Sequence, residues 1–451
     1  MDLLVGMIIT FCLLIYSVLN GFFVGIPLTV GYLIFAIIAW LRGFGVKETI
    51  GMSFEGGKKA YVVLVIFVLI GAITGIWMAS GTVPGVVFYG IQLMNPKLFI
   101  LYTFLLTCIV AFLLGTSLGT VGTVGIALMV MAKSGGVDAN VAAGAIIAGA
   151  YFGDRCSPMS SSANLVANLT GTALYSNILT MFKTGLLPLL VSIGLYGVLS
   201  LWHPLNFTGT GIDQEISKAF NINGVVLLPA VVILVLSAFK VNVRLSMLIS
   251  IGTAAVISVL LQDYSVVEVM MTIGMGFRLE GSETLAAILN GGGIVSMWKA
   301  SFVIYVSCAM AGIFNGTGML RGVETLFSKS RTRSGLFANT AAVSVLTAAF
   351  GCNQSISTVL TNQIMGNTYR LKGVEEDQLA SDLENTGIVL AALIPWNLAA
   401  FVPTLTMDVS TTGYLPYAFY LYLLPLMTFG ALKLKELRGS GGLLESVKRS
   451  V

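Results

Sequence analysis

Long apolar stretches separated by short polar segments follow one another along most of the chain. Each approaches the roughly 18 to 20 apolar positions that an α-helix needs to cross a bilayer. The strict alternation of apolar and polar residues that marks the strands of a membrane barrel is not found. Because a helix satisfies its own backbone hydrogen bonds in lipid, the pattern predicts transmembrane helices. The clearest examples are 3–18, 61–76, 98–114, 184–202 and 225–239.

Breaks rich in glycine, serine and threonine recur at about half the chain length. The break at 115–120 has a counterpart at 351–357, and the segments that begin at Gly75 and Gly312 are 237 positions apart. Asp154 and Glu384, each near a break, are 230 positions apart. Repeats of this kind place broken helices near the membrane centre, where their free backbone groups bind ions or substrates. We expect one transporter unit, 1–451, with repeat halves at 1–215 and 225–435 and a cytoplasmic tail at 436–451.

Composition is that of a membrane protein. Hydrophobic residues make up 56% of the chain, charged residues 10%, and the mean hydropathy is +0.93. Soluble domains carry about 25% charged residues. No basic residue precedes the first apolar stretch, so we expect that stretch to be the first membrane helix and not a cleaved signal peptide.

Basic residues cluster in a few short loops, which predicts that these loops are cytoplasmic. Two apolar stretches precede Arg42, so the N-terminus is also expected to be cytoplasmic, in a bacterial-type inner membrane. The lipid bilayer is the expected partner, and no nucleic acid is. The basic residues are Arg42, Lys47, Lys58 and Lys59; Arg321, Lys329, Arg331 and Arg333; Arg370 and Lys372; and Lys433, Lys435, Arg438, Lys448 and Arg449.

Cysteine and histidine usage argues against a disulfide framework, a metal centre or an enzyme. The five cysteines lie in apolar or glycine-rich segments without paired spacing, and His203 is the single histidine. One histidine and no His–Glu metal motif leave few candidates for general base chemistry. We therefore expect no enzymatic activity and no cofactor, with Na⁺ and H⁺ as transported or coupling ions.

The strongest chemical signal lies at 153–164. Asp154 and Arg155 follow a run of small and apolar residues, and charges at membrane depth are costly and mark functional sites. Pro158 removes a helix hydrogen-bond donor, and serines and Asn164 supply oxygens around the break. This combination predicts a cradle for a cation or a small solute. An ion pair at a helix end on the membrane surface is the alternative interpretation.

The segment resembles the signature of the NhaC antiporter family, and the resemblance continues in order along most of the chain. The resemblance implies an all-α polytopic membrane protein of the ion transporter superfamily with an inverted repeat, broken helices and re-entrant hairpins. We expect about 10 to 13 membrane segments and, by the same resemblance, a homodimer. The matching residues are Gly153-Asp154-Arg155, Ser157-Pro158, Asn164-Leu165 and Gly171-Thr172; Gly115-Thr116-Ser117, Gly119-Thr120 and Gly122-Thr123; the segments 77–84 and 291–297; Leu383-Glu384-Asn385; Ile394-Pro395-Trp396-Asn397; and 414–419.

The candidate site residues fall into two groups. Since a partly buried carboxylate can hold either a cation or a proton, Asp154 is the first candidate for both and the expected Na⁺ ligand, followed by Glu384. Neutral donors expected beside them for ion or proton binding are Ser157, Ser161, Asn164, Asn353 and Asn385. Substrate contacts are expected from Arg155, Thr116, Ser117, Thr120, Ser160, Ser355 and Asn397. Arg155 either pairs with Asp154 or holds a substrate carboxylate.

Departures from the family leave the cargo open. Ser161 and Asn353 stand where family members tend to have aspartate, and Asn385 replaces the second residue of an acidic pair. Asp408 stands where the family more often has a small residue. The leading hypothesis is an NhaC-like Na⁺/H⁺ antiporter that works by alternating access. The alternative is a Na⁺- or H⁺-coupled transporter or exchanger of a small organic acid or amino acid on the same fold.

Overall fold

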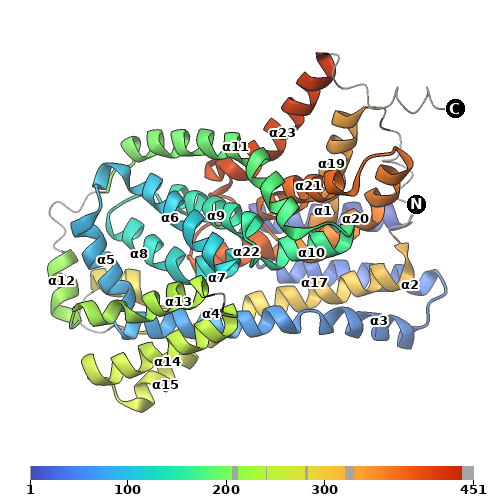
Figure 1. The fold of residues 1–451 in the computed structure, drawn as a ribbon. Coiled ribbons are helices and arrows are strands. Elements are labelled where there is room, and N and C mark those ends of the chain that lie inside the picture. The colour runs from blue at the N-terminus through green and yellow to red at the C-terminus, as the bar shows by residue number, and fades with distance from the viewer. Residues whose placement is uncertain are drawn as a thin grey trace.

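The computed structural model describes residues 2–205, 212–239, 241–279, 283–319, 330 and 332–438. Within these ranges the chain is helical, and its one β-bridge joins Phe277 to Gly291 (Figure 1). The predicted all-α class is confirmed. The expected tail beyond residue 438 and the basic residues Arg321, Lys329 and Arg331 lie outside the described residues.

The first half of the described chain contains eleven α-helices. They are α1 (Asp2–Leu19), α2 (Gly25–Leu41), α3 (Val46–Lys58), α4 (Tyr61–Ala79), α5 (Thr82–Leu93), α6 (Phe99–Leu114), α7 (Ser117–Thr120), α8 (Ile126–Ser134), α9 (Ala139–Cys156), α10 (Ser161–Thr170) and α11 (Leu174–Trp202). A π-helical segment, Val121–Gly125, joins α7 to α8.

The remaining helices follow a short linking helix, α12 (Ile212–Ala219). They are α13 (Leu228–Ala238), α14 (Val243–Leu261), α15 (Val266–Met275), α16 (Glu283–Leu289), α17 (Trp298–Thr317), α19 (Arg333–Gly351), α20 (Gln354–Leu371), α21 (Glu376–Leu390), α22 (Leu398–Thr406) and α23 (Phe419–Leu437).

Membrane-spanning length is reached by six helices of the described chain, or by up to eight if two bent pairs each count as one span. One bent pair joins α3 to α4 at 46°, and the other joins α21 to α22 at 48°. Four shorter apolar helices, α1, α2, α15 and the segment ending in α13, accompany them. Counted with these, the segments fall within the predicted range, and a polytopic protein with broken helices is confirmed.

Two helix breaks have the same local structure. After α6, Gly115 takes a left-handed conformation with φ 65° and Thr116 caps α7; after α19, Cys352 does the same with φ 48° and Asn353 caps α20. The two caps are 237 residues apart. The other two breaks, before α10 and α22, end in the caps Ser160 and Asn397, also 237 residues apart. Each is preceded by a proline, which cannot continue a helix.

These breaks cross in pairs inside the bundle. A Cβ atom on Gly115 would lie 2.6 Å from the backbone carbon of Met159, in the break before α10. In the second pair, the Leu398 N–H donates to the Cys352 carbonyl over 3.0 Å. Each crossing therefore brings the start of a short helix, α10 or α22, beside the end of a longer one, α6 or α19.

Helices of the first half pack against helices of the second half along one side of the molecule, where α3, α4 and α17 run side by side (Figure 1). The helix α3 packs on α17, and α15 packs on α4. A Cβ atom on Gly56 would lie 2.2 Å from the Cys308 carbonyl oxygen, so glycine is what permits the close approach of α3 and α17. The division into 1–215 and 225–435 stays a prediction, which these paired contacts and the 237-residue spacing support.

Candidate functional site

Asp154 lies in the last turn of α9, where the first pair of breaks crosses. Its carboxylate accepts two hydroxyl hydrogen bonds, from Ser160 Oγ at 2.7 Å and from Ser117 Oγ at 3.0 Å. Ser117 is the first residue of α7, and Ser160 is the N-cap of α10. The N-terminal ends of both short helices thus face one carboxylate, and the positive end of a helix dipole stabilises negative charge.

The surroundings of Asp154 provide no protein cation. The residue is 5% exposed, and no lysine or arginine of the described ranges lies within 4.0 Å of its oxygens. A buried, unpaired carboxylate carries a desolvation cost of several kcal/mol. Two hydroxyl donors offset only part of this cost, so the site favours a bound proton or a small cation at Asp154. Hydroxyl and carboxylate oxygens are the ligands that such a cation takes.

Arg155 points away from this crossing and into a neutral shell of acceptors. Its guanidinium donates to the Met181 carbonyl at 3.2 Å, to the Tyr420 hydroxyl at 3.0 Å and to Thr184 Oγ1 at 3.0 Å. It also donates to the side-chain oxygen of Asn385. The residue is fully buried, and among the described residues no carboxylate lies within 4.0 Å of it. Arg155 therefore joins α9 to α11, α21 and α23.

Glu384 is the second buried acid of this region. Both of its carboxylate oxygens are buried and have no hydrogen-bond partner, and the residue is close enough to interact electrostatically with Arg155 and Asp154. Its neighbour Asn385 accepts from Arg155 and, at 3.3 Å, from Thr184 Oγ1. An unpartnered ionised acid is costly in the interior, so this environment favours a bound proton or a cation at Glu384.

The other predicted site residues serve mainly as caps. Ser157 Oγ accepts from the Met159 N–H, and Asn164 donates to the Ser160 carbonyl at 2.7 Å, so both hold the break before α10. Thr116, Asn353 and Asn397 are N-caps, of α7, α20 and α22. Thr120 bonds back to the Thr116 carbonyl. Ser161 and Ser355 are exposed in the first turns of α10 and α20, and the hydroxyl partners of Asp154 are instead Ser117 and Ser160.

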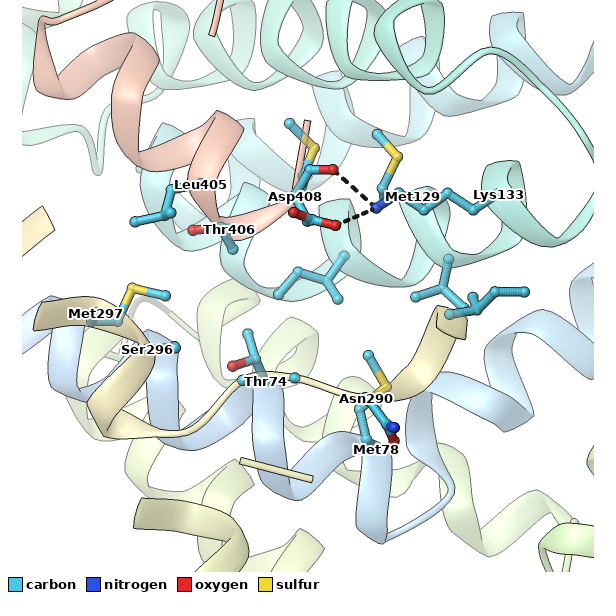
Figure 2. A pocket seen from close by; sticks show the side chains of 16 residues that line it. Thr74, Met78, Met129, Lys133, Asn290, Ser296, Met297, Leu405, Thr406 and Asp408 are labelled. Atoms are coloured by element: carbon cyan, nitrogen blue, oxygen red, sulfur yellow. Dashed lines mark hydrogen bonds and ion pairs between the residues drawn. The ribbon is translucent and has the colours of Figure 1, made fainter. Parts of the chain in front are cut away.

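A cavity of about 390 Å³ opens at the end of the bundle where α8 and α22 finish (Figure 2). Lys133, at the end of α8, donates to the Asp408 carbonyl at 3.0 Å and lies 3.3 Å from its carboxylate. Figure 2 shows this pair above the cavity, with Thr74 and Met78 of α4 on the other wall. The pair joins the C-terminal ends of two helical segments: α7 with α8, which begins at the first crossing, and α22, which begins at the second.

A second cavity, of about 360 Å³, lies where α19 and α21 begin and α23 ends. This is the end of the bundle at which α1 starts (Figure 1), and we refer to it as the terminal face. Thr184 and Asn385, which both contact Arg155, line this cavity.

Sequence reasoning missed the partners of Arg155. Tyr420 and Thr184 lie far from Arg155 in the chain, and no local pattern singles them out. It also missed Arg333 and Asp382, a buried ion pair with 2.7 Å between the guanidinium and the carboxylate. Asp382 could have been found, because it is an acid two residues before Glu384 in an otherwise apolar and neutral helical turn.

Known proteins resemble the chain over most of its length. A family model described as the Na⁺/H⁺ antiporter family matches residues 149–433. The Na⁺/H⁺ antiporter NhaC of Alkalihalophilus pseudofirmus is 28% identical over 412 residues, covering 89% of this chain and 88% of that protein. The malate-2H⁺/Na⁺-lactate antiporter of Bacillus subtilis is 29% identical over 402 residues, with 87% and 85% covered. The arginine/ornithine antiporter ArcD of Halobacterium salinarum is 28% identical over 398 residues, with 85% and 79% covered.

Proposed function

The chain belongs to the Na⁺/H⁺ antiporter family, and from this we propose that it is a secondary transporter that exchanges Na⁺ for H⁺ by alternating access at Asp154. The observation that carries the proposal is the Asp154 carboxylate, buried between two hydroxyl donors at crossed helix breaks, with no lysine or arginine of the described residues within 4.0 Å. Such a group needs a positive partner from solution. Since one carboxylate holds either a proton or Na⁺, binding of one displaces the other, which couples their movements.

Ser117 and Ser160 hold the carboxylate and offer Na⁺ two further oxygens. Both stand at the first turns of short helices, so a movement of α7 or α10 changes the coordination of the ion directly. Helices that are broken in this way, as before α7 and α10, suit an ion site that opens alternately to either side of the membrane.

Cytoplasmic placement of the terminal face is part of the proposal. The helix α2 ends there at Arg42, α19 begins there with Arg333, and α20 ends there at Arg370 and Lys372 (Figure 1). An excess of basic residues in short loops marks the cytoplasmic side. The N-terminus would then be cytoplasmic as well. Assembly as a homodimer stays a prediction from the family resemblance.

Transport of a small organic acid or amino acid is the second candidate, and two relatives carry such names. The site for its carboxylate would be Arg155. However, Arg155 already donates to four oxygen acceptors of the protein, and none of its surface is exposed. An organic anion would have to displace these bonds, so the geometry favours the inorganic cation.

Everted membrane vesicles test the proposal. We expect Na⁺ to collapse an imposed pH gradient with the wild-type chain, and Asp154→Asn to abolish the response while the protein keeps its melting temperature within a few degrees. Ser161→Ala, at an exposed position nearby, is the matched control and should transport normally. A wild-type chain that ignores Na⁺ and Li⁺ but exchanges an amino or hydroxy acid would refute the cation proposal and support the second candidate.

A further inference from the structure

The cavity at the terminal face is lined almost entirely by residues with polar or charged side chains, in a chain that is mostly apolar. Its wall contains hydroxyl, amide and charged side chains from α11, α19, α21 and α23, with Leu432 as its one aliphatic side chain. A cavity of about 360 Å³ lined by such residues has both the room and the hydrogen-bonding partners that water needs.

One face of α21 runs along this cavity as far as Asn385, which bonds to Arg155. Gln378, Ser381, Asp382 and Asn385 all line it, and the spacing of three and four residues places them on one stripe of the helix. Asn385, at the inner end of the stripe, accepts a hydrogen bond from Arg155. Arg155 follows Asp154 in the chain, and Glu384 precedes Asn385. The stripe thus leads from the terminal face to Asn385 and Arg155, whose chain neighbours are Glu384 and Asp154.

Asp382 lies midway along the stripe and is 3% exposed. Its carboxylate lies 2.7 Å from the Arg333 guanidinium and accepts from the Tyr369 hydroxyl at 2.5 Å. Tyr369 in turn pairs with Thr340 of α19 at 2.8 Å. The other charged groups that line the cavity are Asp377 on α21 and Lys435 and Glu436 on α23. Asp382 therefore has one close cation, which is itself 11% exposed toward the cavity.

We propose that this cavity is the water-filled route by which Na⁺ and protons reach Asp154 from the terminal face, and that Asp382 binds the travelling cation when Arg333 moves away from it. The inference rests on the proposed Na⁺/H⁺ exchange. Arg333 is the first residue of α19 and extends from a helix end, so it can leave Asp382 without breaking the helix. Asp382 would then receive a cation about one helical turn before Asn385 and the charges beside it.

A purely structural role for the ion pair makes a different prediction. Breaking a buried pair by removing one partner leaves an uncompensated charge, whereas removing both partners together is often neutral or stabilising. If the pair only holds α19 to α21, the double variant Arg333→Gln/Asp382→Asn regains both folding and transport. If Asp382 binds the cation, the double variant regains folding alone.

The first experiment compares Asp382→Asn, Arg333→Gln and the double variant with the wild type. The melting temperature is measured in detergent, and Na⁺-dependent collapse of a pH gradient is measured in everted vesicles. We expect the double variant to melt near the wild type but to need at least about tenfold more Na⁺ for half-maximal exchange, since a lost charged contact contributes about 1.5 to 3 kcal/mol. Wild-type Na⁺ dependence in a folded double variant would overturn the role of Asp382.

The second experiment tests the route itself and does not depend on these variants folding. Ser381→Cys should react with a positively charged, membrane-impermeant methanethiosulfonate added to the terminal face, above the background of the native thiols. Na⁺ should slow the reaction. Thr386→Cys is the matched control, because Thr386 is fully buried on the same helix and bonds to the Asp382 carbonyl; it should stay unmodified.

The outcomes separate the two proposals. If Ser381→Cys does not react while the variant still transports, the route is wrong although Na⁺/H⁺ exchange stands. If the wild type shows no response to Na⁺, the exchange proposal fails. If Ser381→Cys is labelled and Na⁺ does not slow the labelling, the cavity is filled with water but does not carry Na⁺.

Discussion

Gly153→Ala should damage both stability and transport, because Gly153 lies where α9 touches α6 directly beside Asp154. A Cβ atom at this position would lie 2.4 Å from the Ala111 Cβ, 2.4 Å from the Phe112 nitrogen and 2.6 Å from the Cys108 carbonyl oxygen. Comfortable contacts between such atoms are about 3.5 to 4.0 Å. Two of the three obstacles are backbone atoms of α6, so they cannot rotate away. The two helices must separate locally by about 1 Å.

The cost follows from this displacement. Overpacking of a tight interface costs about 1 to 3 kcal/mol, and alanine returns up to about 1 kcal/mol through its higher helix propensity. Ser117 follows α6 across the Gly115 turn, so a shift of α9 stretches its 3.0 Å bond to Asp154 beyond hydrogen-bonding distance. Loss of a bond to a carboxylate, worth about 1.5 to 3 kcal/mol, corresponds to at least a tenfold effect on ion binding.

The assay compares Gly153→Ala with Gly194→Ala. Gly194 lies inside α11, and a Cβ atom there would meet nothing within 4 Å, so its replacement tests helix propensity alone. We expect Gly194→Ala to melt at or above the melting temperature of the wild type and to transport normally. Gly153→Ala should melt several degrees lower and should need at least about tenfold more Na⁺ for half-maximal exchange. If Gly153→Ala melts with the control and transports as well, the close packing of α6 and α9 does not support the site.

Two further predictions concern Arg155 and the opposite cavity. Arg155→Lys should lower the melting temperature by several degrees, because a single ammonium cannot donate to all four oxygen acceptors on three helices. Each buried group left unpaired costs about 1 to 3 kcal/mol. Tyr420→Phe removes one acceptor and should lower the melting temperature by less. An unchanged melting temperature in Arg155→Lys would refute the anchoring role. Lys133→Met should change the unfolding free energy by less than about 1 kcal/mol, since Asp408 is 98% exposed and solvated pairs contribute little. A larger loss, measured by denaturant or heat, would show that the pair above the cavity in Figure 2 is a structural tie.

The sequence predicted the positions of the breaks well because their causes are local. Gly115 adopts the left-handed turn that glycine permits, Pro158 ends α9, and Ser160 caps the next helix. The family resemblance likewise indicated a helical transporter before any coordinates. These features depend on a few neighbouring residues, so the chain alone displays them.

The sequence predicted the register of the two repeats less precisely than it predicted the positions of the breaks. The sequence paired Asp154 with Glu384, 230 positions later, because both are acids near a break. The caps Ser160 and Asn397 are 237 residues apart, which places Ala391 at the position corresponding to Asp154. Glu384 is thus about two helical turns earlier in its half, and it reaches the same region through the packing of α21 against α9. Only tertiary packing decides this.

The direction of the two neighbouring charges is the most consequential result of that packing. Successive side chains on a helix diverge by about 100°, so Asp154 faces the crossed breaks while Arg155 faces α11, α21 and α23. Asp154 and Arg155 therefore do not form an ion pair with each other. When both acids are ionised, Asp154, Arg155 and Glu384 leave one net negative charge in the interior, and an uncompensated buried charge is costly. One proton or one Na⁺ removes it, whereas both together would leave a positive excess. We therefore expect the region to hold one or the other at a time, which is the condition that exchange through a single site requires.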